Sequence, residues 1–173
     1  MKKHPILFCV VAMLFIVIGA YVSNSHFTPK NPQNNAVRTL FSQKLPDAQG
    51  KTQALSQWQG KHLILNFWAP WCAPCVQEMP ELSALQKEIT AKNIQIIGIG
   101  IDSAAHIAEF SEKHKVDYPL YVAGISGAEL ARQFGNQAGG LPFTVLIDAT
   151  GQIKKTYIGR LKMEELQQGL LLF

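Results

Sequence analysis

The chain has 173 residues, 47% of them hydrophobic, which is enough for one sizeable core with short appendages. Sixteen Lys and Arg against twelve Asp and Glu give a formal net charge of +4, and Lys2 and Lys3 belong to the extreme N-terminus. The remaining positive excess is small and scattered, so it does not favour nucleic acid as a partner. The sequence contains no glycine-rich phosphate loop, no low-complexity tract and no internal repeat.

The N-terminal segment predicts export. Residues 5–22 carry no charged side chain and follow a pair of lysines. As a helix this segment spans about 27 Å, close to the hydrocarbon thickness of a bilayer. The flanking charge predicts an N-terminus inside the cell and the rest of the chain outside the cytoplasm. We therefore expect residues 1–23 to be a single-pass anchor in the cytoplasmic membrane; a signal peptide cleaved near Ser23 or Ser25 is the alternative.

Residues 24–36 predict a linker. They are polar and contain Pro29, Pro32 and an Asn-Asn pair. Fully extended, they reach about 45 Å, so a folded domain over residues 37–173 would work close to the membrane.

The first part of the domain predicts a crossover between parallel strands. Residues 37–43, followed by an Asp-Ala-Gln-Gly-Lys turn, predict a short leading hairpin. Residues 62–68 and 94–101 are rich in Ile and Leu, which is typical of buried parallel strands. Between them, apolar residues at spacings of three and four mark one face of a helix: Val76, Met79, Leu82, Leu85 and Ile89.

The second part predicts another helix and strand and then a hairpin. Asp102 or Ser103 is placed to cap a helix, and residues 118–122 predict a strand. The remaining predicted elements are a short helix over 129–134, antiparallel strands over 143–148 and 152–158, and a closing helix carrying Met163, Leu166 and Leu170. The fold class is therefore α/β, with a mixed sheet flanked by helices.

Two cysteines follow the first crossover strand directly. Cys72 and Cys75 are separated by Ala-Pro. If a helix begins at the first thiol, its free N–H groups and positive dipole end stabilise a thiolate on Cys72, the form that attacks disulfides. Cys75 then lies one turn deeper and can resolve the mixed disulfide. We predict a redox-active Cys72–Cys75 disulfide at the carboxyl edge of the sheet, where reaction sites are favoured.

Two other roles for the cysteine pair are weaker. A disulfide that closes so short a loop constrains the unfolded chain little, so a purely structural role is disfavoured. A zinc site needs two more ligands, yet Cys9 lies in the apolar N-terminal segment, and His62, His106 and His114 lack the spacing of a zinc-binding pair. We predict no metal and no cofactor, and we assign these histidines no role.

Three motifs carry a resemblance to a known family: Asn-Phe-Trp-Ala-Pro-Trp-Cys-Ala-Pro-Cys at 66–75, Glu-Met-Pro at 78–80, and Gly-Leu-Pro-Phe-Thr at 140–144. Over residues 37–173 the chain resembles the thioredoxin superfamily, and within it the membrane-anchored, exported thiol:disulfide oxidoreductases of the TlpA/ResA type. The resemblance implies a thioredoxin fold with an N-terminal hairpin, a central helix-strand insertion, and a dithiol facing a proline. Cytoplasmic thioredoxins usually carry a buried aspartate where this chain has Asn66, so a proton relay through that position is not implied.

Glu78 is the candidate proton carrier. It lies one helical turn after Cys75 on the same face. In the exported proteins that the chain resembles, a glutamate at the matching place assists proton transfer near the dithiol. Desolvation beside the thiols would raise the pKa of this carboxyl and make it a usable base near neutral pH. An ordinary solvated glutamate is the alternative.

Substrate contacts are expected on both sides of the dithiol. The resemblance implies a cis Leu141–Pro142 bond whose backbone pairs with an extended substrate segment, although a proline before a strand is also a common boundary device. Trp71, next to the nucleophile, is expected to shield the dithiol or contact substrate, whereas Trp68 continues the strand and is expected in the core.

These patterns predict an exported thiol:disulfide oxidoreductase acting on protein thiols and disulfides. Because a bacterial exported space is kept oxidising, a reductase there needs a membrane electron donor. The resemblance favours such a dedicated reductase, for example of apocytochrome c. An oxidant of the same fold, a non-catalytic binding module and a copper-handling protein remain alternatives. A peroxiredoxin-type peroxidase is disfavoured because Ala69 stands where its motif requires threonine.

Overall fold

The computed structural model describes residues 12–16, 18–19 and 32–173, and the chain divides into two compact units, Met1–Asn31 and Pro32–Phe173. In the first unit, residues 12–16 and 18–19 are helical. Most of the predicted anchor, and the predicted linker as far as residue 31, lie outside the described residues. Within the described ranges, no helix combines the length and the apolarity that crossing a bilayer requires.

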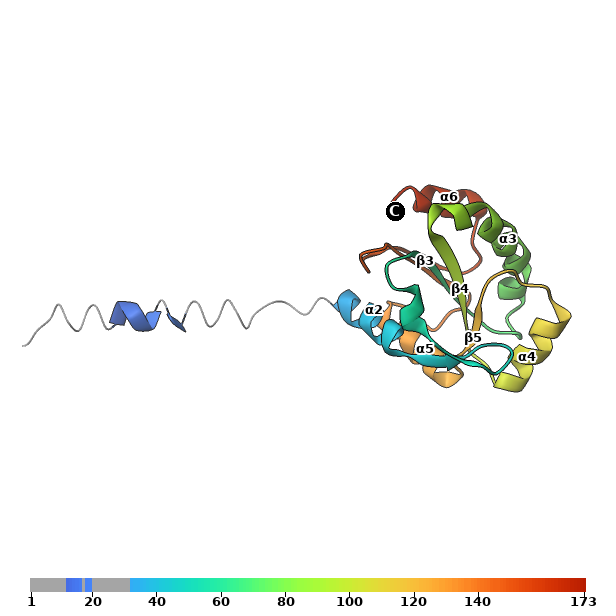
Figure 1. Ribbon diagram of the computed structural model, residues 1–173, viewed down its shortest axis with the longest axis horizontal. Helices are drawn as coiled ribbons and strands as arrows, with labels where there is room; N and C mark the ends of the chain where they lie inside the picture. Colours follow the sequence, from blue (N-terminus) through green and yellow to red (C-terminus); the bar gives the residue numbers. More distant parts are fainter. Residues whose placement is uncertain (1–11, 17, 20–31) are drawn as a thin grey trace, which may run out of the picture. The chain divides into compact units, whose positions relative to one another are not determined.

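The second unit is a five-stranded mixed sheet with helices on both faces (Figure 1). Its helices are α2 (Pro32–Ser42), α3 (Ala73–Ile89), α4 (Ala104–Lys113), α5 (Ile125–Gln133) and α6 (Met163–Leu170), with 3-10 turns η1 (Leu55–Trp58) and η2 (Thr90–Lys92). Its strands are β1 (Lys44–Pro46), β2 (Thr52–Ala54), β3 (His62–Trp68), β4 (Ile94–Gly100), β5 (Leu120–Val122), β6 (Phe143–Ile147) and β7 (Ile153–Ile158).

The start of the domain differs from the sequence-based prediction. The strand predicted over 37–43 is wrong, because these residues fall almost entirely in α2, which also takes in Pro32 and the residues up to Ala36. Ala36, Val37 and Leu40 recur at helical spacing and are buried in the core, so packing on the sheet favours a helix over an exposed hairpin strand. The hairpin itself exists further along, as β1 and β2.

The central sheet confirms the predicted crossover and the predicted second hairpin. The strand order is β5-β4-β3-β6-β7. Strand β3 pairs with β4 in parallel and with β6 antiparallel, and β6 pairs with β7 antiparallel. The additional helix and strand, α4 and β5, follow β4 as expected, and Ser103 caps α4 by accepting the His106 N–H at 3.2 Å. The thioredoxin fold class predicted from the sequence is therefore confirmed.

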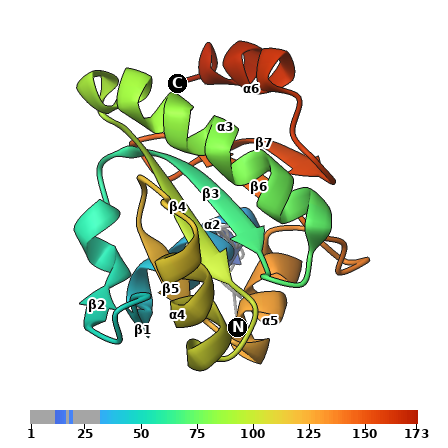
Figure 2. The same ribbon diagram turned by 90° about the vertical axis from the view of Figure 1, so that its right-hand side faces the viewer.

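Alternation along β3 divides the core into two layers. Leu63, Leu65 and Phe67 face one way and pack with residues of α2 and α5. Ile64 and Trp68 face the other way and pack with residues of α3, α4 and α6. Figure 2 shows α3 lying across this second face of the sheet. Because side chains alternate along a strand, Asn66 also points to the α3 side.

Gln86 of α3 secures the edge of β4 that the short strand β5 leaves uncovered. Its Oε1 accepts the Ile96 N–H at 2.6 Å and Gln95 Nε2 at 3.0 Å. Because Leu has a similar size but cannot accept a hydrogen bond, we expect Gln86→Leu to leave this buried N–H unpaired and lower the free energy of unfolding by about 1–3 kcal/mol. Urea unfolding measures the difference. Gln77→Leu, an exposed change on the same helix, is the matched control, and equal losses in both variants would contradict the assignment.

Candidate active site

Helix α3 begins at the first cysteine, as predicted. Cys72 is the N-cap with an extended backbone, and its Sγ accepts the Cys75 N–H at 3.3 Å. Pro74 lies in the first turn, where a missing N–H costs nothing. The Cys72 sulfur is thus placed against a free N–H group and the positive end of the helix dipole. Both favour a thiolate once the bond is reduced.

The two sulfurs form a disulfide and differ in accessibility. The Sγ atoms of Cys72 and Cys75 lie 2.03 Å apart. Cys72 is 5% exposed and Cys75 is 0% exposed. Of the two cysteines only Cys72 keeps any solvent exposure, which favours it as the one that a partner disulfide approaches, while Cys75 is placed to attack it from within the fold.

The two tryptophans near the dithiol occupy opposite environments. Trp68 is fully buried, with its ring centroid 4.8 Å from that of Phe110, which confirms its predicted place in the core. Trp71 is 68% exposed. It lies on the wall of a groove of about 490 Å³ that adjoins the start of α3 and runs along α4, lined by Pro70, Trp71, Val76, Asp102, His106, Glu109, Phe110, Lys113 and His114.

An acid-histidine pair lies in this groove. Asp102 Oδ1 lies 2.7 Å from His106 Nδ1 and accepts the Ser103 N–H at 2.6 Å. Partial desolvation acts to raise the pKa of Asp102, but these hydrogen bonds outweigh it and hold the pKa below its ordinary value. The groove therefore presents a fixed carboxylate close to the exposed indole.

Glu78 is buried on α3, one helical turn after Cys75, and is not a solvated helix residue. Its side chain is 0% exposed. Oε1 accepts Asn66 Nδ2 at 2.8 Å, and Oε2 accepts the Leu161 N–H at 2.9 Å. Burial raises the pKa of Glu78 above its ordinary value, and the hydrogen bonds from Leu161 and Asn66 and the charge of Arg160 offset this only in part. A carboxyl group of this kind can exchange a proton closer to neutral pH than a surface glutamate can.

The Leu141–Pro142 segment belongs to the same region. The peptide bond between these residues is cis, as the resemblance implies. Pro142 is buried, and its carbonyl accepts the Gly159 N–H at 2.8 Å. Leu141 is partly buried and packs against the hydrophobic cluster that contains both cysteines. Leu141 thus packs on the same cluster as the two cysteines, and Glu78 lies one helical turn after Cys75 on α3.

A family model described as Redoxin matches residues 30–169 of this chain. The chain belongs to the Redoxin family.

Relatives of this Redoxin-family protein carry names that describe disulfide exchange. It is 27% identical over 173 residues to thiol-disulfide oxidoreductase ResA of Geobacillus thermodenitrificans, covering 98% of this chain and 97% of the relative. It is 29% identical over 173 residues to ResA of Bacillus thuringiensis subsp. konkukian, with the same coverage. Among solved structures, the exposed lipoprotein thioredoxin of Streptococcus pneumoniae superimposes with a TM-score of 0.65 at 25% identity, covering 76% of this chain and 98% of that one. This Redoxin-family protein is thus a thioredoxin-like, ResA-type thiol:disulfide oxidoreductase that carries a Cys72–Cys75 pair.

Sequence reasoning missed the groups that hold Glu78 in this Redoxin-family protein. The family resemblance marks Asn66 only as a departure from cytoplasmic thioredoxins, although a polar residue within an apolar strand is a signal for a buried hydrogen bond. The Leu161 N–H leaves no such signal because any residue except proline can supply it. Within the described part of the chain, no three His, Cys, Asp or Glu side chains gather closely enough to hold a metal ion.

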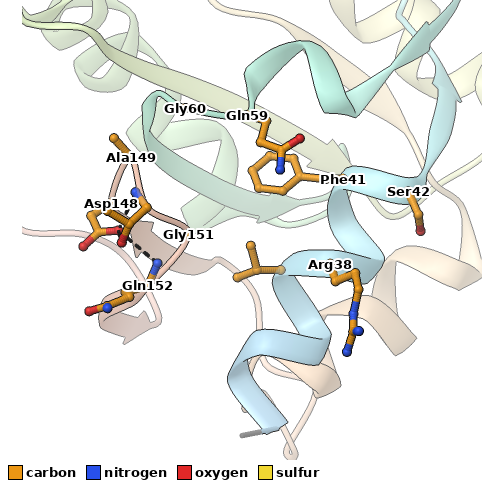
Figure 3. Close-up of a pocket in the computed structure, with 11 residues that line it drawn as sticks. Arg38, Phe41, Ser42, Gln59, Gly60, Asp148, Ala149, Gly151 and Gln152 are labelled. Atoms are coloured by element: carbon orange, nitrogen blue, oxygen red, sulfur yellow. Dashed lines mark hydrogen bonds between the residues drawn. The ribbon is translucent and has the colours of Figure 1, made fainter. Parts of the chain in front are cut away.

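A larger pocket in this Redoxin-family protein, of about 800 Å³, lies among α2, the turn before β3 and the β6–β7 turn (Figure 3). Gln59 and Gly60 line it and precede β3, whereas Cys72 follows the other end of that strand. Asp148 Oδ1 accepts the Gln152 N–H at 2.9 Å and closes the β6–β7 turn at the rim. The pocket contains none of the predicted site residues and is separate from the dithiol.

Proposed function

We propose that this Redoxin-family protein is an exported, membrane-tethered reductase of specific protein disulfides, and that Cys72 and Cys75 carry out the exchange. The observation that carries the proposal is the bonded pair of cysteines at the start of α3, of which only Cys72 keeps any solvent exposure. The names of the relatives support the chemistry. Export, substrate class and direction are the further steps of the proposal.

The exchange proceeds in two attacks. In the reduced protein, the Cys72 thiolate attacks one sulfur of a substrate disulfide, forming a mixed disulfide and releasing the other substrate sulfur as a thiolate, which takes up a proton from water. Cys75 then attacks Cys72 Sγ, restores the Cys72–Cys75 disulfide and releases the second substrate sulfur as a thiolate, which also takes up a proton from water. The substrate gains two electrons, the protein loses two, and a membrane electron donor must reduce the disulfide before the next cycle.

Glu78 acts as the proton acceptor in the second attack. Cys75 is fully buried, so its thiol has no access to bulk water as a base. The carboxyl of Glu78 lies one helical turn further along α3 and is itself buried. Its raised pKa brings its affinity for a proton closer to that of a thiol. In the proposal, the proton leaves Cys75 for Glu78 as the sulfur attacks.

Export rests on the N-terminal segment. The charge-free residues 5–22 after two lysines support a membrane anchor with the catalytic domain outside the cytoplasm. One structural neighbour is the exposed lipoprotein thioredoxin of Streptococcus pneumoniae. Because an exported space is oxidising, a tether that keeps the domain near a membrane electron donor suits a reductase better than an oxidant. Apocytochrome c is the expected type of substrate.

Docking combines Trp71 with the backbone of Leu141. We expect Trp71→Ala to lower kcat/KM for a protein substrate about tenfold or more, while exchange with a small disulfide such as oxidised glutathione changes little. Because Trp71 is 68% exposed, the unfolding midpoint should stay nearly unchanged. Steady-state kinetics with both substrates and a thermal melt measure these effects. Equal losses with both substrates would instead place the indole in the chemistry itself.

The decisive experiment traps the partner. Full-length Cys75→Ser, expressed in its native membrane, should accumulate mixed disulfides on Cys72, because the resolving thiol is missing. Mass spectrometry identifies the attached proteins, and Cys72→Ser is the control that should trap none. We expect the attached proteins to be exported proteins with disulfides, such as apocytochrome c.

The direction is tested by the redox state in the same membrane. Rapid acid quenching and alkylation should find the Cys72–Cys75 pair of the wild type mainly reduced if it is a reductase. A pair that is mainly oxidised, with newly synthesised thiol proteins trapped on Cys72, would make the protein an oxidant. An absence of any trapped partner together with inert thiols would leave only a binding role and would reject the proposal.

A further inference from the structure

The carboxyl group of Glu78 is held by Asn66, a residue that the proposed exchange does not use. Asn66 is 0% exposed in the middle of β3. Its Nδ2 donates to Glu78 Oε1 at 2.8 Å and to Thr144 Oγ1 at 3.0 Å. Both N–H groups of the amide are therefore engaged. Its Oδ1 is also buried and has no hydrogen-bond partner among the residues that the structure describes.

Strand pairing explains why these three side chains meet. Asn66 of β3 and Thr144 of β6 are directly opposite each other in the antiparallel register. Their neighbours Trp68 and Leu146 belong to the core layer under α3, so alternation points Asn66 and Thr144 to that layer as well. Glu78 enters the same layer from α3. The strand register and the position of α3 thus bring Asn66, Thr144 and Glu78 together. Thr144 lies on β6, the strand that directly follows Pro142.

The Asn66 amide can form hydrogen bonds with Glu78 and with the Thr144 hydroxyl whether the Glu78 carboxyl is ionised or protonated. An ionised carboxylate only accepts, and it needs the amide nitrogen facing it. A protonated carboxyl donates, and it needs the amide oxygen facing it. Rotation of the Asn66 amide by about 180° exchanges its nitrogen and oxygen, and the rotating Thr144 hydroxyl can then donate to the oxygen instead of accepting from the nitrogen. On this side, the Glu78 carboxyl and the Thr144 hydroxyl each keep a hydrogen bond to the amide in both states, and the amide atom that faces away from them has no partner in either.

We propose that Asn66 is a positioning residue whose amide turns with the protonation state of Glu78, and that the Thr144 hydroxyl accepts from the amide in one orientation and donates to it in the other. The inference rests on the proposed function, because it specifies how the fold stores the proton that Cys75 gives up. The proton moves from Cys75 Sγ to Glu78 and later leaves to solvent. The amide turn itself transfers no proton and only exchanges donors for acceptors.

The titration of Glu78 can be distinguished from the effects of the other charged and titratable groups near it. Arg160 and Glu81 act on Glu78 with opposite signs and pair with each other, Arg160 Nη2 lying 3.0 Å from Glu81 Oε1. Burial, and then the charge of Glu78, raise the pKa of Tyr118 far above its ordinary value, so its hydroxyl stays neutral. Cys72 and Cys75 do not titrate in the disulfide form. The oxidised protein therefore shows the titration of Glu78 without coupling to the thiols.

The test follows Glu78 and Asn66 by NMR as a function of pH, in the full-length oxidised chain in detergent micelles. Carboxyl ¹³C shifts of labelled glutamate give the midpoint of Glu78, assigned with Glu78→Gln, and ¹H–¹⁵N spectra give the side-chain amide of Asn66. The Asn66 amide signals should move with the same midpoint as the Glu78 carboxyl. The amide of Asn136 is the matched control, because it is also buried and donates instead to the Gly140 carbonyl, at 2.8 Å; its signals should not follow that midpoint.

Substitutions of Asn66 and of Thr144 show how strongly each residue affects the titration midpoint of Glu78. Asn66→Leu should raise the Glu78 midpoint by about one pH unit, because the ionised form loses the stronger, charge-assisted hydrogen bond. Asn66→Asp should raise it by roughly two units or more, because two adjacent carboxyls hold one proton between them. Thr144→Val should shift it less than Asn66→Leu does, and Thr144→Ser should restore the wild-type value. A purely structural role of Asn66 would lower stability and leave these midpoints in place.

A Glu78 midpoint that stays unchanged in folded Asn66→Leu, or Asn66 amide signals that do not respond across the titration, would overturn the inference. If Asn66→Leu does not fold, the inference is tested by the pH response of the Asn66 amide in the wild type and by the Glu78 midpoint in Asn66→Asp. Insulin-disulfide reduction by the same wild-type preparation separates the two proposals. An active protein without the coupling rejects only the inference, and an inactive protein with the coupling rejects only the proposed function.

Discussion

Replacing Cys72 by serine is expected to reduce thiol:disulfide exchange at least about a thousandfold. The serine hydroxyl stays protonated at neutral pH and forms no disulfide, and the remaining thiol of Cys75 is fully buried where no partner reaches it. Reduction of insulin by the full-length protein, followed as turbidity with dithiothreitol as the electron source, measures the loss. Cys9→Ser is the matched control and should retain the wild-type rate.

The same sulfur should be unusually acidic. In the reduced protein, the pH dependence of Cys72 alkylation by iodoacetamide should have its midpoint below the value of about 8.5 for a free thiol, because a helix N–H and the helix dipole stabilise the anion. Cys75 should react far more slowly. An ordinary midpoint for Cys72, or wild-type turnover in Cys72→Ser, would be incompatible with the proposed chemistry.

Replacing Glu78 by glutamine is expected to slow exchange roughly a hundredfold near neutral pH, the usual contribution of a positioned general base. The amide is nearly isosteric with the carboxyl but cannot accept the proton from Cys75. Stopped-flow measurements on the mixed disulfide give the pH dependence of the attack by Cys75. In Glu78→Gln this pH profile should no longer show a transition at the pKa of Glu78. Glu88→Gln is the control on the same helix, since its side chain is exposed. Similar profiles for the wild type and Glu78→Gln would remove Glu78 from the mechanism.

The same substitution should change how stability depends on pH. The pKa of Glu78 in the folded protein is raised above its ordinary value of 4.5, so between that pH and the raised pKa the folded state binds more protons than the unfolded state. The free energy of unfolding of the wild type therefore falls as pH rises through this window. Glu78→Gln carries no such ionisation, so its stability relative to the wild type should increase across the same window. Urea unfolding at a series of pH values measures this, and parallel curves would show that Glu78 does not titrate there.

Local sequence determined the elements around the dithiol. The apolar run of β3, the recurrence of Val76, Met79 and Leu82, and the position of Cys72 between strand and helix all depend on neighbours close in the chain. For that reason, the bounds of β3 and the start of α3 were predicted within a residue. Glu78 was found for the same reason, because its relation to Cys75 is a spacing along one helix.

Tertiary structure decided what local patterns left open. Residues 37–42 form a helix because Val37 and Leu40 bury against the sheet, a contact with distant strands that a short window does not contain. The environment of Glu78 likewise depends on Asn66, Thr144 and the N–H of Leu161, which strand register and the loop after β7 bring to it from far along the chain. Sequence spacing thus determined which residues carry the chemistry. Only the packing of the sheet against α3 decided how deeply the carboxyl is buried and which groups share its proton, because desolvation and hydrogen bonding arise from atoms that meet only in the folded chain.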